Sequence, residues 1–103
     1  MVICVKIKVL DGKKVLEHFF VRSKKWGLPA GIIEKNESPK QAAKRELLER
    51  TGLKVFIKDL EYIGEEKRKD EFIFKIFKTE KNKTKKIAEP GELGGYSTKI
   101  RWK

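Results

Sequence analysis

The sequence predicts a mixed α/β domain, in which β-sheet packs as a sandwich with one main helix. Two observations carry this prediction. Apolar residues alternate with polar ones near the N-terminus and again after residue 53, and a single segment between these regions has helix signals at both ends. A chain of 103 residues can bury one modest core, so we expect one domain over residues 1–103.

The N-terminal part is predicted to form a β-hairpin. Every second residue between positions 3 and 9 is apolar, which is the period of a half-buried strand. The Asp-Gly pair at residues 11–12 is a hairpin signal, and we expect the return strand over residues 15–22. His18 lies in that strand and is the only histidine of the chain, so we expect it to be structural.

A short extended segment, residues 26–31, is expected to lead into a loop that ends at Ser38. Pro29 biases Leu28 away from helical conformation. Gly31 permits a close backbone approach or a positive φ. The segment therefore predicts a bend just before the loop.

The main helix is predicted over Pro39 to Thr51. Ser38 is a good N-cap, proline suits the first helical turn, and Gln41 completes a capping box with Ser38. Gly52 is the expected residue just beyond the C-terminal end. These signals define the helix more sharply than any other element of the chain.

Three further strands are predicted after the helix, over residues 53–63, 72–77 and 96–102. The connections around them are expected to be a charged turn, a basic loop and a glycine-rich segment, at residues 64–70, 81–86 and 88–95. The sequence shows no internal repeat and no linker long enough to divide it into two domains.

The formal net charge is +11, from 26 Lys and Arg against 15 Asp and Glu. Such a balance attracts polyanions, so nonspecific binding of nucleic acid is one expectation. The other reading is a thermophile-like composition. Charged residues make up 40% of the chain, and in hyperthermophile proteins they form surface ion-pair networks.

The composition also bears on the compartment. Cys4 is the only cysteine, which excludes an internal disulfide and fits a reducing environment. The sequence has no apolar run of the length that spans a membrane, and its first residues do not resemble a signal peptide. We therefore expect a cytoplasmic protein without membrane contact.

Two acids on the predicted helix could bind a metal. Glu46 and Glu49 are three residues apart and so project from one face. Oxygen ligands that converge from one face suit a hard divalent cation such as Mg²⁺ or Mn²⁺. Arg45 could pair with Glu37 from the loop and fix the loop to the helix. Taken alone, such acids are also what solvated salt bridges on a lysine-rich helix would look like.

The spacing around these acids resembles the Nudix box, G-x5-E-x7-R-E-U-x-E-E-x-G-U, where U is a bulky aliphatic residue. The box would span residues 31–53, and eight of its nine specified positions are matched. The matching residues are Gly31, Glu37, Arg45, Glu46, Leu47, Glu49, Gly52 and Leu53. Features outside the box are also typical of the family, and they are Trp26-Gly27-Leu28-Pro29, Glu34, Ser38-Pro39, Ala42-Ala43 and Ile100-Arg101-Trp102.

The resemblance implies a Nudix fold and a MutT-like hydrolase that cleaves the pyrophosphate bond of a nucleoside di- or triphosphate derivative. It implies Mg²⁺ or Mn²⁺ as cofactor. The metal ligands would be Glu46, Glu49 and the backbone carbonyl of Ala30, and Glu37 with Arg45 would be the orienting pair.

The resemblance also implies a distal glutamate that binds metal or acts as a base. The candidates are Glu89 and Glu92, and Glu89 is slightly preferred. Trp26 and Gly31 would lie at the substrate. Aromatic residues near the expected cleft could stack a base, although at strand spacing they also suit a core; they are Trp26, Tyr62, Phe72 and Phe74.

The sequence departs from the family pattern at Arg50, where the box has a second glutamate. An arginine cannot become a metal ligand, but at four residues from Glu46 it could pair with it. A basic residue in the last turn of a helix is also favoured by the helix dipole. Arg50 therefore predicts either a weaker metal site or, as the alternative function, an inactive Nudix domain that binds nucleotide or RNA through a basic surface.

Two other departures bear on assembly and substrate. A C-terminal helix that family members usually carry is apparently absent, so a homodimer could supply the missing cover. Ala30-Gly31 is similar to enzymes acting on ADP-ribose, whereas Trp26 with Leu28-Pro29 equally fits those that cleave nucleoside triphosphates. The nucleobase and the leaving group stay open.

Overall fold

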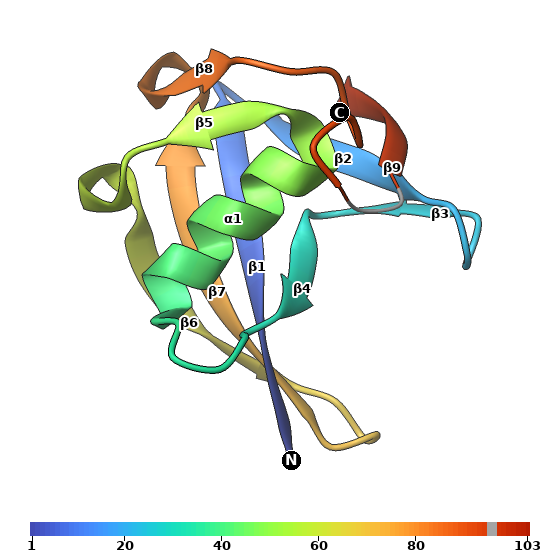
Figure 1. The fold of residues 1–103 in the computed structure, drawn as a ribbon, viewed down its shortest axis with the longest axis vertical. Helices are drawn as coiled ribbons and strands as arrows, with labels where there is room; N and C mark the ends of the chain where they lie inside the picture. The colour runs from blue at the N-terminus through green and yellow to red at the C-terminus, as the bar shows by residue number, and fades with distance from the viewer. Residues whose placement is uncertain (95–96) are drawn as a thin grey trace.

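One α-helix and two β-sheets make up the described part of the chain, residues 1–94 and 97–103, in a computed structural model (Figure 1). This confirms the mixed α/β class with one main helix. The elements in order are β1 (Val2–Asp11), β2 (Lys14–Phe20), β3 (Lys25–Gly27), β4 (Ala30–Ile32), α1 (Pro39–Thr51), β5 (Leu53–Val55), η1 (Ile57–Asp59), β6 (Glu61–Lys67), β7 (Phe72–Glu80), η2 (Lys81–Lys83), β8 (Thr84–Lys86) and β9 (Ser97–Trp102).

The large sheet has the order β3-β2-β1-β7-β6, with β4 paired to β1 and β9 paired to β2. Its centre is the parallel pair β1 and β7, which runs in register from Val2 opposite Phe72 to Leu10 opposite Glu80. On its other edge β1 changes partner. Its first half pairs with β4, and its end pairs with β2.

Helix α1 lies across one face of the large sheet (Figure 1). Its start is the predicted capping box, in which the Ser38 hydroxyl accepts from the Gln41 amide at 3.1 Å and the Gln41 side chain accepts from the Ser38 amide at 2.8 Å. Its end is Gly52 at φ 77°, whose amide donates to the Leu48 carbonyl. The predicted bounds of the helix are confirmed because all of these signals are local.

The core lies between α1 and the sheet. It is built from alternate residues of β1, the inner face of α1 and a few residues from the rest of the chain. Its buried members are Val5, Ile7, Val9, Leu16, Ala42, Ala43, Leu47, Leu53, Val55, Leu60 and Phe77.

Several predicted strand bounds were wrong. Residues 53–63 are not one strand, because β5 pairs with β8 while β6 pairs with β7, and the 3-10 turn η1 carries the chain between the two sheets. The expected charged turn at 64–70 is mostly strand, since β6 continues to Lys67. The expected basic loop at 81–86 contains η2 and β8.

The first hairpin also turns one residue later than predicted, because Asp11 pairs with Lys14 and leaves Gly12 and Lys13 as the turn. Gly12 has φ 60°, as a glycine at the first position of such a turn requires. Of the predicted final elements, Gly95 and Tyr96 lie outside the described residues. Among the helices that the structure describes, none is long and apolar enough to cross a membrane.

Candidate functional site

The side chain of Glu46 is held between α1 and β4. Gly31 on β4 makes this possible, because a Cβ at that position would collide with the Glu46 carboxylate. Glu46 is 5% exposed, so its charge has little water around it and needs partners. The glycine expected to allow a close approach is thus where Glu46 meets the backbone.

Arg45 connects the acids of the helix to the loop before it. Its guanidinium donates to both oxygens of Glu37 at 2.8 and 3.0 Å, and to the carbonyl of Ile32 at 3.0 Å. Its Nη1 donates to Glu46 Oε1 at 2.7 Å and lies 3.4 Å from Glu49 Oε2. Hydrogen bonding to Arg45 lowers the pKa of the Glu37 carboxyl, and the same bond raises the pKa of Arg45.

Arg50 forms a hydrogen bond with the second carboxylate oxygen of Glu46. Its Nε donates to Glu46 Oε2 at 3.2 Å, one helical turn away. Together with Arg45, it gives the buried carboxylate two guanidinium partners. The pairing that the spacing suggested is therefore present, and it lies where the family pattern has an acid.

The donor set was tested for its fit to a divalent cation. No group of three or more His, Cys, Asp or Glu side chains is placed to hold a metal among residues 1–94 and 97–103. Glu46 and Glu49, however, converge on a single cationic nitrogen, Arg45 Nη1, so both carboxylates can face one positive charge. Mg²⁺ in proteins is often bound by one or two carboxylates plus substrate phosphates and water. The cluster fits an ion shared with a substrate, and not one enclosed by protein.

The distal segment, residues 88–94, contacts α1 through the backbone of Gly94. Gly94 lies against the Glu49 side chain, where an added Cβ would be 3.7 Å from Glu49 Cγ. Glu89 pairs with Lys86 at 2.9 Å, and Glu92 accepts from the Glu89 amide at 2.9 Å. Among the contacts of the described residues, neither of these acids reaches the Glu46 and Glu49 carboxylates.

A groove of about 440 Å³ lies beside the cluster and includes Ala30. It contains three cations and three aromatic rings. Its lining is Lys6, Phe20, Ser23, Lys25, Trp26, Gly27, Leu28, Ala30, Arg68 and Phe74. This is the composition expected of a site for a nucleotide, with flat rings for a base and cations for phosphates.

Two cations of the groove were not found from the sequence. Lys6 and Arg68 lie 4.5 and 4.8 Å from the centre of the Phe74 ring, and both pair with Glu66, at 2.8 and 3.4 Å. They are far apart in the chain and meet only because β1, β6 and β7 are neighbours in the sheet. No local sequence signal marks them.

The four aromatic candidates separate into two pairs. Trp26 and Phe74 line the groove, and Trp26 also stacks on the Arg101 guanidinium at 4.3 Å. Tyr62 packs against the Phe77 ring at 5.5 Å, and Phe72 stacks on Phe74 at 6.3 Å. The latter two do not line the groove.

Two buried titratable residues lie near the cluster. His18 is fully buried, and burial followed by the charge of Arg50 lowers its pKa to about 4. Burial raises the pKa of the Cys4 thiol. Both groups are therefore neutral near pH 7.

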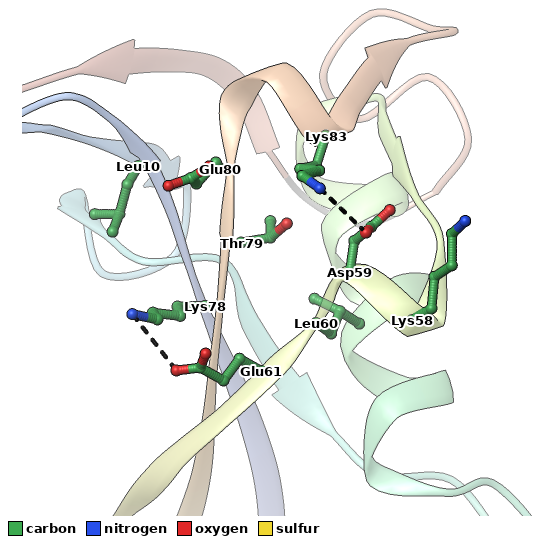
Figure 2. Close-up of a pocket in the computed structure, with 9 residues that line it drawn as sticks. All are labelled: Leu10, Lys58, Asp59, Leu60, Glu61, Lys78, Thr79, Glu80 and Lys83. Atoms are coloured by element: carbon green, nitrogen blue, oxygen red, sulfur yellow. Dashed lines mark ion pairs between the residues drawn. The ribbon is translucent and has the colours of Figure 1, made fainter.

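A second hollow, about 330 Å³, lies where β7 ends and β6 begins (Figure 2). Its charges are balanced, with ion pairs between Lys78 and Glu61 at 3.4 Å and between Lys83 and Asp59 at 3.7 Å. It has no aromatic lining, and it includes no residue of β4, whereas the groove includes Ala30. The cationic groove is therefore the better candidate for a substrate.

The chain was compared with known families, proteins and structures. The NUDIX domain family matches residues 5–102. The m7GpppN-mRNA hydrolase dcap-2 of Caenorhabditis elegans is 36% identical over 64 residues, which is 62% of this chain and 8% of that protein. The chain thus spans a small part of the length of this relative.

Solved structures show the same fold. A NUDIX family hydrolase from Clostridium perfringens has a TM-score of 0.78 at 22% identity, over 98% of this chain and 79% of that one. A MutT NUDIX hydrolase from Burkholderia pseudomallei has 0.79 at 14% identity, over 98% and 81%. A MutT/nudix family protein from Enterococcus faecalis has 0.75 at 21%, over 98% of this chain but 42% of that one. Because the family match covers nearly the whole chain, the protein belongs to the NUDIX domain family.

Proposed function

We propose that the protein is a divalent-metal-dependent pyrophosphohydrolase that acts on a nucleoside di- or triphosphate derivative. The observation that carries this proposal is the convergence of Glu46 and Glu49 on one cationic nitrogen beside a groove of cations and aromatic rings. An acidic cluster that can share a metal ion with a substrate, next to a cationic groove, suits phosphoryl transfer, which depends on positioning and electrostatic stabilisation.

Each residue of the cluster has a distinct task in this proposal. Glu46 and Glu49 would hold Mg²⁺ or Mn²⁺ together with the Ala30 carbonyl, and the bound ion would lower the pKa of an attacking water and offset phosphate charge. Arg45, locked to Glu37 by two hydrogen bonds, keeps both carboxylates in place. Glu89 is kept as the proposed distal acid, with Glu92 as the alternative.

The groove would hold the nucleotide. Trp26 and Phe74 offer ring surface to a base, while Lys6, Lys25 and Arg68 offer charge to phosphates. The name of the dcap-2 relative describes a hydrolase of the m7GpppN cap of mRNA. Capped RNA therefore joins nucleoside triphosphates and ADP-ribose as candidate substrates.

A second candidate function is favoured by the bond from Arg50 to Glu46. If this guanidinium holds the carboxylate permanently, the domain would bind nucleotide or RNA without cleaving it. The charge of +11 fits such a binder, and its affinity for RNA would fall steeply with salt.

A hydrolysis panel tests the first proposal. Nucleoside triphosphates, ADP-ribose, dinucleoside polyphosphates and capped RNA would be incubated with Mg²⁺ or Mn²⁺ and the wild type, Glu46→Gln or Glu80→Gln. Glu80 is exposed and outside the cluster. Metal-dependent turnover should fall roughly 100-fold in Glu46→Gln and stay unchanged in Glu80→Gln. Equal turnover in all three proteins would refute the assigned role of Glu46.

A further inference from the structure

Arg50 lines a separate hollow of about 350 Å³ at the end of α1. The hollow is formed with the end of β2 and the turn after it, and its lining is Phe20, Val21, Arg22, Ser23 and Arg50. Phe20 and Ser23 also line the cationic groove. The two hollows thus adjoin the same short segment, residues 20–23.

The guanidinium of Arg50 has two edges with different surroundings. Its Nε is used by Glu46 Oε2 at 3.2 Å. Among the contacts of the described residues, its two terminal nitrogens have no hydrogen-bond acceptor. The side chain is 19% exposed, so these donors sit at the wall of a hollow and not in bulk water. Arginine donors in such a place suit phosphate oxygens, which they can bind in pairs.

Arg22, an exposed arginine, also lines this hollow. Two arginines therefore line one hollow, and each can contribute positive charge to a bound anion. The hydrogen bond from Arg50 Nε to Glu46 holds the guanidinium in one orientation. The two terminal nitrogens of Arg50 are therefore also held in place. This fixed pair of guanidinium donors distinguishes the hollow from the exposed lysines of the surface.

We propose that Arg50 and Arg22 form a phosphate-binding subsite beside the glutamate cluster, and that it selects substrates with a chain of three or more phosphates. This inference rests on the proposed function, since it concerns the same substrate. A phosphate oxygen about 2.8 Å from a terminal nitrogen of Arg50 would lie close to the Glu46 carboxylate. The bond to be cleaved would lie over Glu46 and Glu49, and the next phosphate along the chain would reach Arg50.

This subsite gives Arg50 a role where the family pattern has a metal ligand. The position would bind the phosphate directly instead of through an ion. A diphosphate linked to a sugar, as in ADP-ribose, has no third phosphate to place there, whereas a nucleoside triphosphate, a dinucleoside polyphosphate and a triphosphate-linked RNA cap do. The shared chemistry is the polyphosphate chain, and the hydrolysis panel separates its sources.

The test measures binding of inorganic tripolyphosphate and pyrophosphate by calorimetry in EDTA, without metal or turnover. The proteins are wild type, Arg50→Gln, Arg50→Lys, Arg22→Gln and Lys85→Gln. Lys85 is exposed on β8 and lines none of these hollows, so it controls for loss of one positive charge. Tripolyphosphate should bind the wild type more tightly than pyrophosphate does. Its affinity should fall roughly tenfold in both Gln variants of the arginines, and change less than twofold in Lys85→Gln.

Arg50→Lys distinguishes the effect of the guanidinium's paired donors from the effect of its positive charge alone. Lysine keeps the charge and the favourable helix-end position but lacks the second donor edge, so it should bind tripolyphosphate nearly as weakly as Arg50→Gln. Wild-type affinity in Arg50→Lys, an equal loss in Lys85→Gln, or no loss in Arg22→Gln would overturn the proposal. Arg22→Gln leaves the bond from Arg50 to Glu46 intact, so it reports on the subsite even if Arg50→Gln proves unstable in a thermal melt.

The outcome is separable from that of the proposed function. Arginine-dependent binding in a protein without turnover would refute the hydrolase and leave the subsite standing. Turnover dependent on Glu46, with tripolyphosphate binding independent of both arginines, would do the reverse.

Discussion

Arg50 changes the electrostatics of the site at the scale of a single residue. Four carboxylates and two guanidinium groups meet there, with a formal charge of −2, whereas a glutamate at position 50 would make it −4. The members are Glu34, Glu37, Glu46, Glu49, Arg45 and Arg50. The remaining negative charge still attracts a divalent cation, but less strongly. We therefore expect half-saturation at a higher metal concentration than in a family member whose box has a glutamate at this position.

His18 provides a test of buried charge. Its pKa in the folded chain is lowered to about 4, first by burial and then by Arg50, against about 6.5 in an unfolded chain. The unfolded chain binds more protons between these values, so stability should fall as the pH drops from about 6.5 to 4. The part due to His18 between pH 7 and pH 4.5 is on the order of 2 kcal/mol. Urea unfolding of wild type and His18→Leu at both pH values measures it, and an equal pH dependence in the two proteins would contradict it.

Thr79 offers a stabilising substitution. It is 4% exposed, and its hydroxyl has no hydrogen-bond partner among the described residues. Thr79→Val removes this buried polar atom and should raise the free energy of unfolding by about 1 kcal/mol, which is a rise of about 4–8 °C in Tm. The matched control is Thr84→Val, because the Thr84 hydroxyl donates to the Lys81 carbonyl at 2.7 Å. A thermal melt in which Thr79→Val is no more stable than Thr84→Val would count against the account.

At the scale of elements, the helix and its acids could be predicted from the sequence because their determinants are local. The cap residues lie within one turn of the helix ends, and the pairing of Arg45 with Glu37 follows from the loop and the helix adjoining each other. The division of residues 53–63 could not be predicted, because it depends on the separate pairing of β5 with β8. The same holds for Lys6 and Arg68, which meet through strands distant in sequence.

The junction between α1 and the distal segment depends on Gly52. Its φ is 77°, and a Cβ there would collide with the Ala88 carbonyl, while the Ile87 amide donates to the Gly52 carbonyl at 2.9 Å. Gly52→Ala should therefore lower the free energy of unfolding in two ways. It puts a non-glycine residue in the left-handed region, and it displaces the segment around Ala88. Gly12→Ala is the control, since Gly12 has φ 60° and open space around its Cβ position. Alanine there should cost about 1 kcal/mol.

Chemical unfolding of these two variants compares the costs directly. Gly52→Ala should lose clearly more stability than Gly12→Ala, and it should also lower activity if the distal segment contributes to the site. Equal losses of stability in the two variants would show that the segment at Ala88 moves aside without destabilising the fold.

At the scale of the whole molecule, residues 1–103 are proposed to form one domain. The core joins β1, α1 and the later strands into a single cluster, so no part can unfold while leaving another core intact. Urea unfolding followed by tryptophan fluorescence and by circular dichroism should give one coincident transition. Two separated transitions would contradict a single domain. The expected homodimer, the cytoplasmic location and the thermophile-like stability stay predictions.

We propose that the glutamate cluster catalyses metal-dependent hydrolysis despite Arg50. The most direct measurement is the rate of nucleoside triphosphate hydrolysis as a function of Mg²⁺ concentration, for wild type and Arg50→Glu. The wild type should turn over substrate at saturating metal, and Arg50→Glu should reach half-saturation at a metal concentration at least roughly tenfold lower. No wild-type turnover at any metal concentration, together with turnover in Arg50→Glu, would contradict this proposal and identify Arg50 as the residue that abolishes hydrolysis.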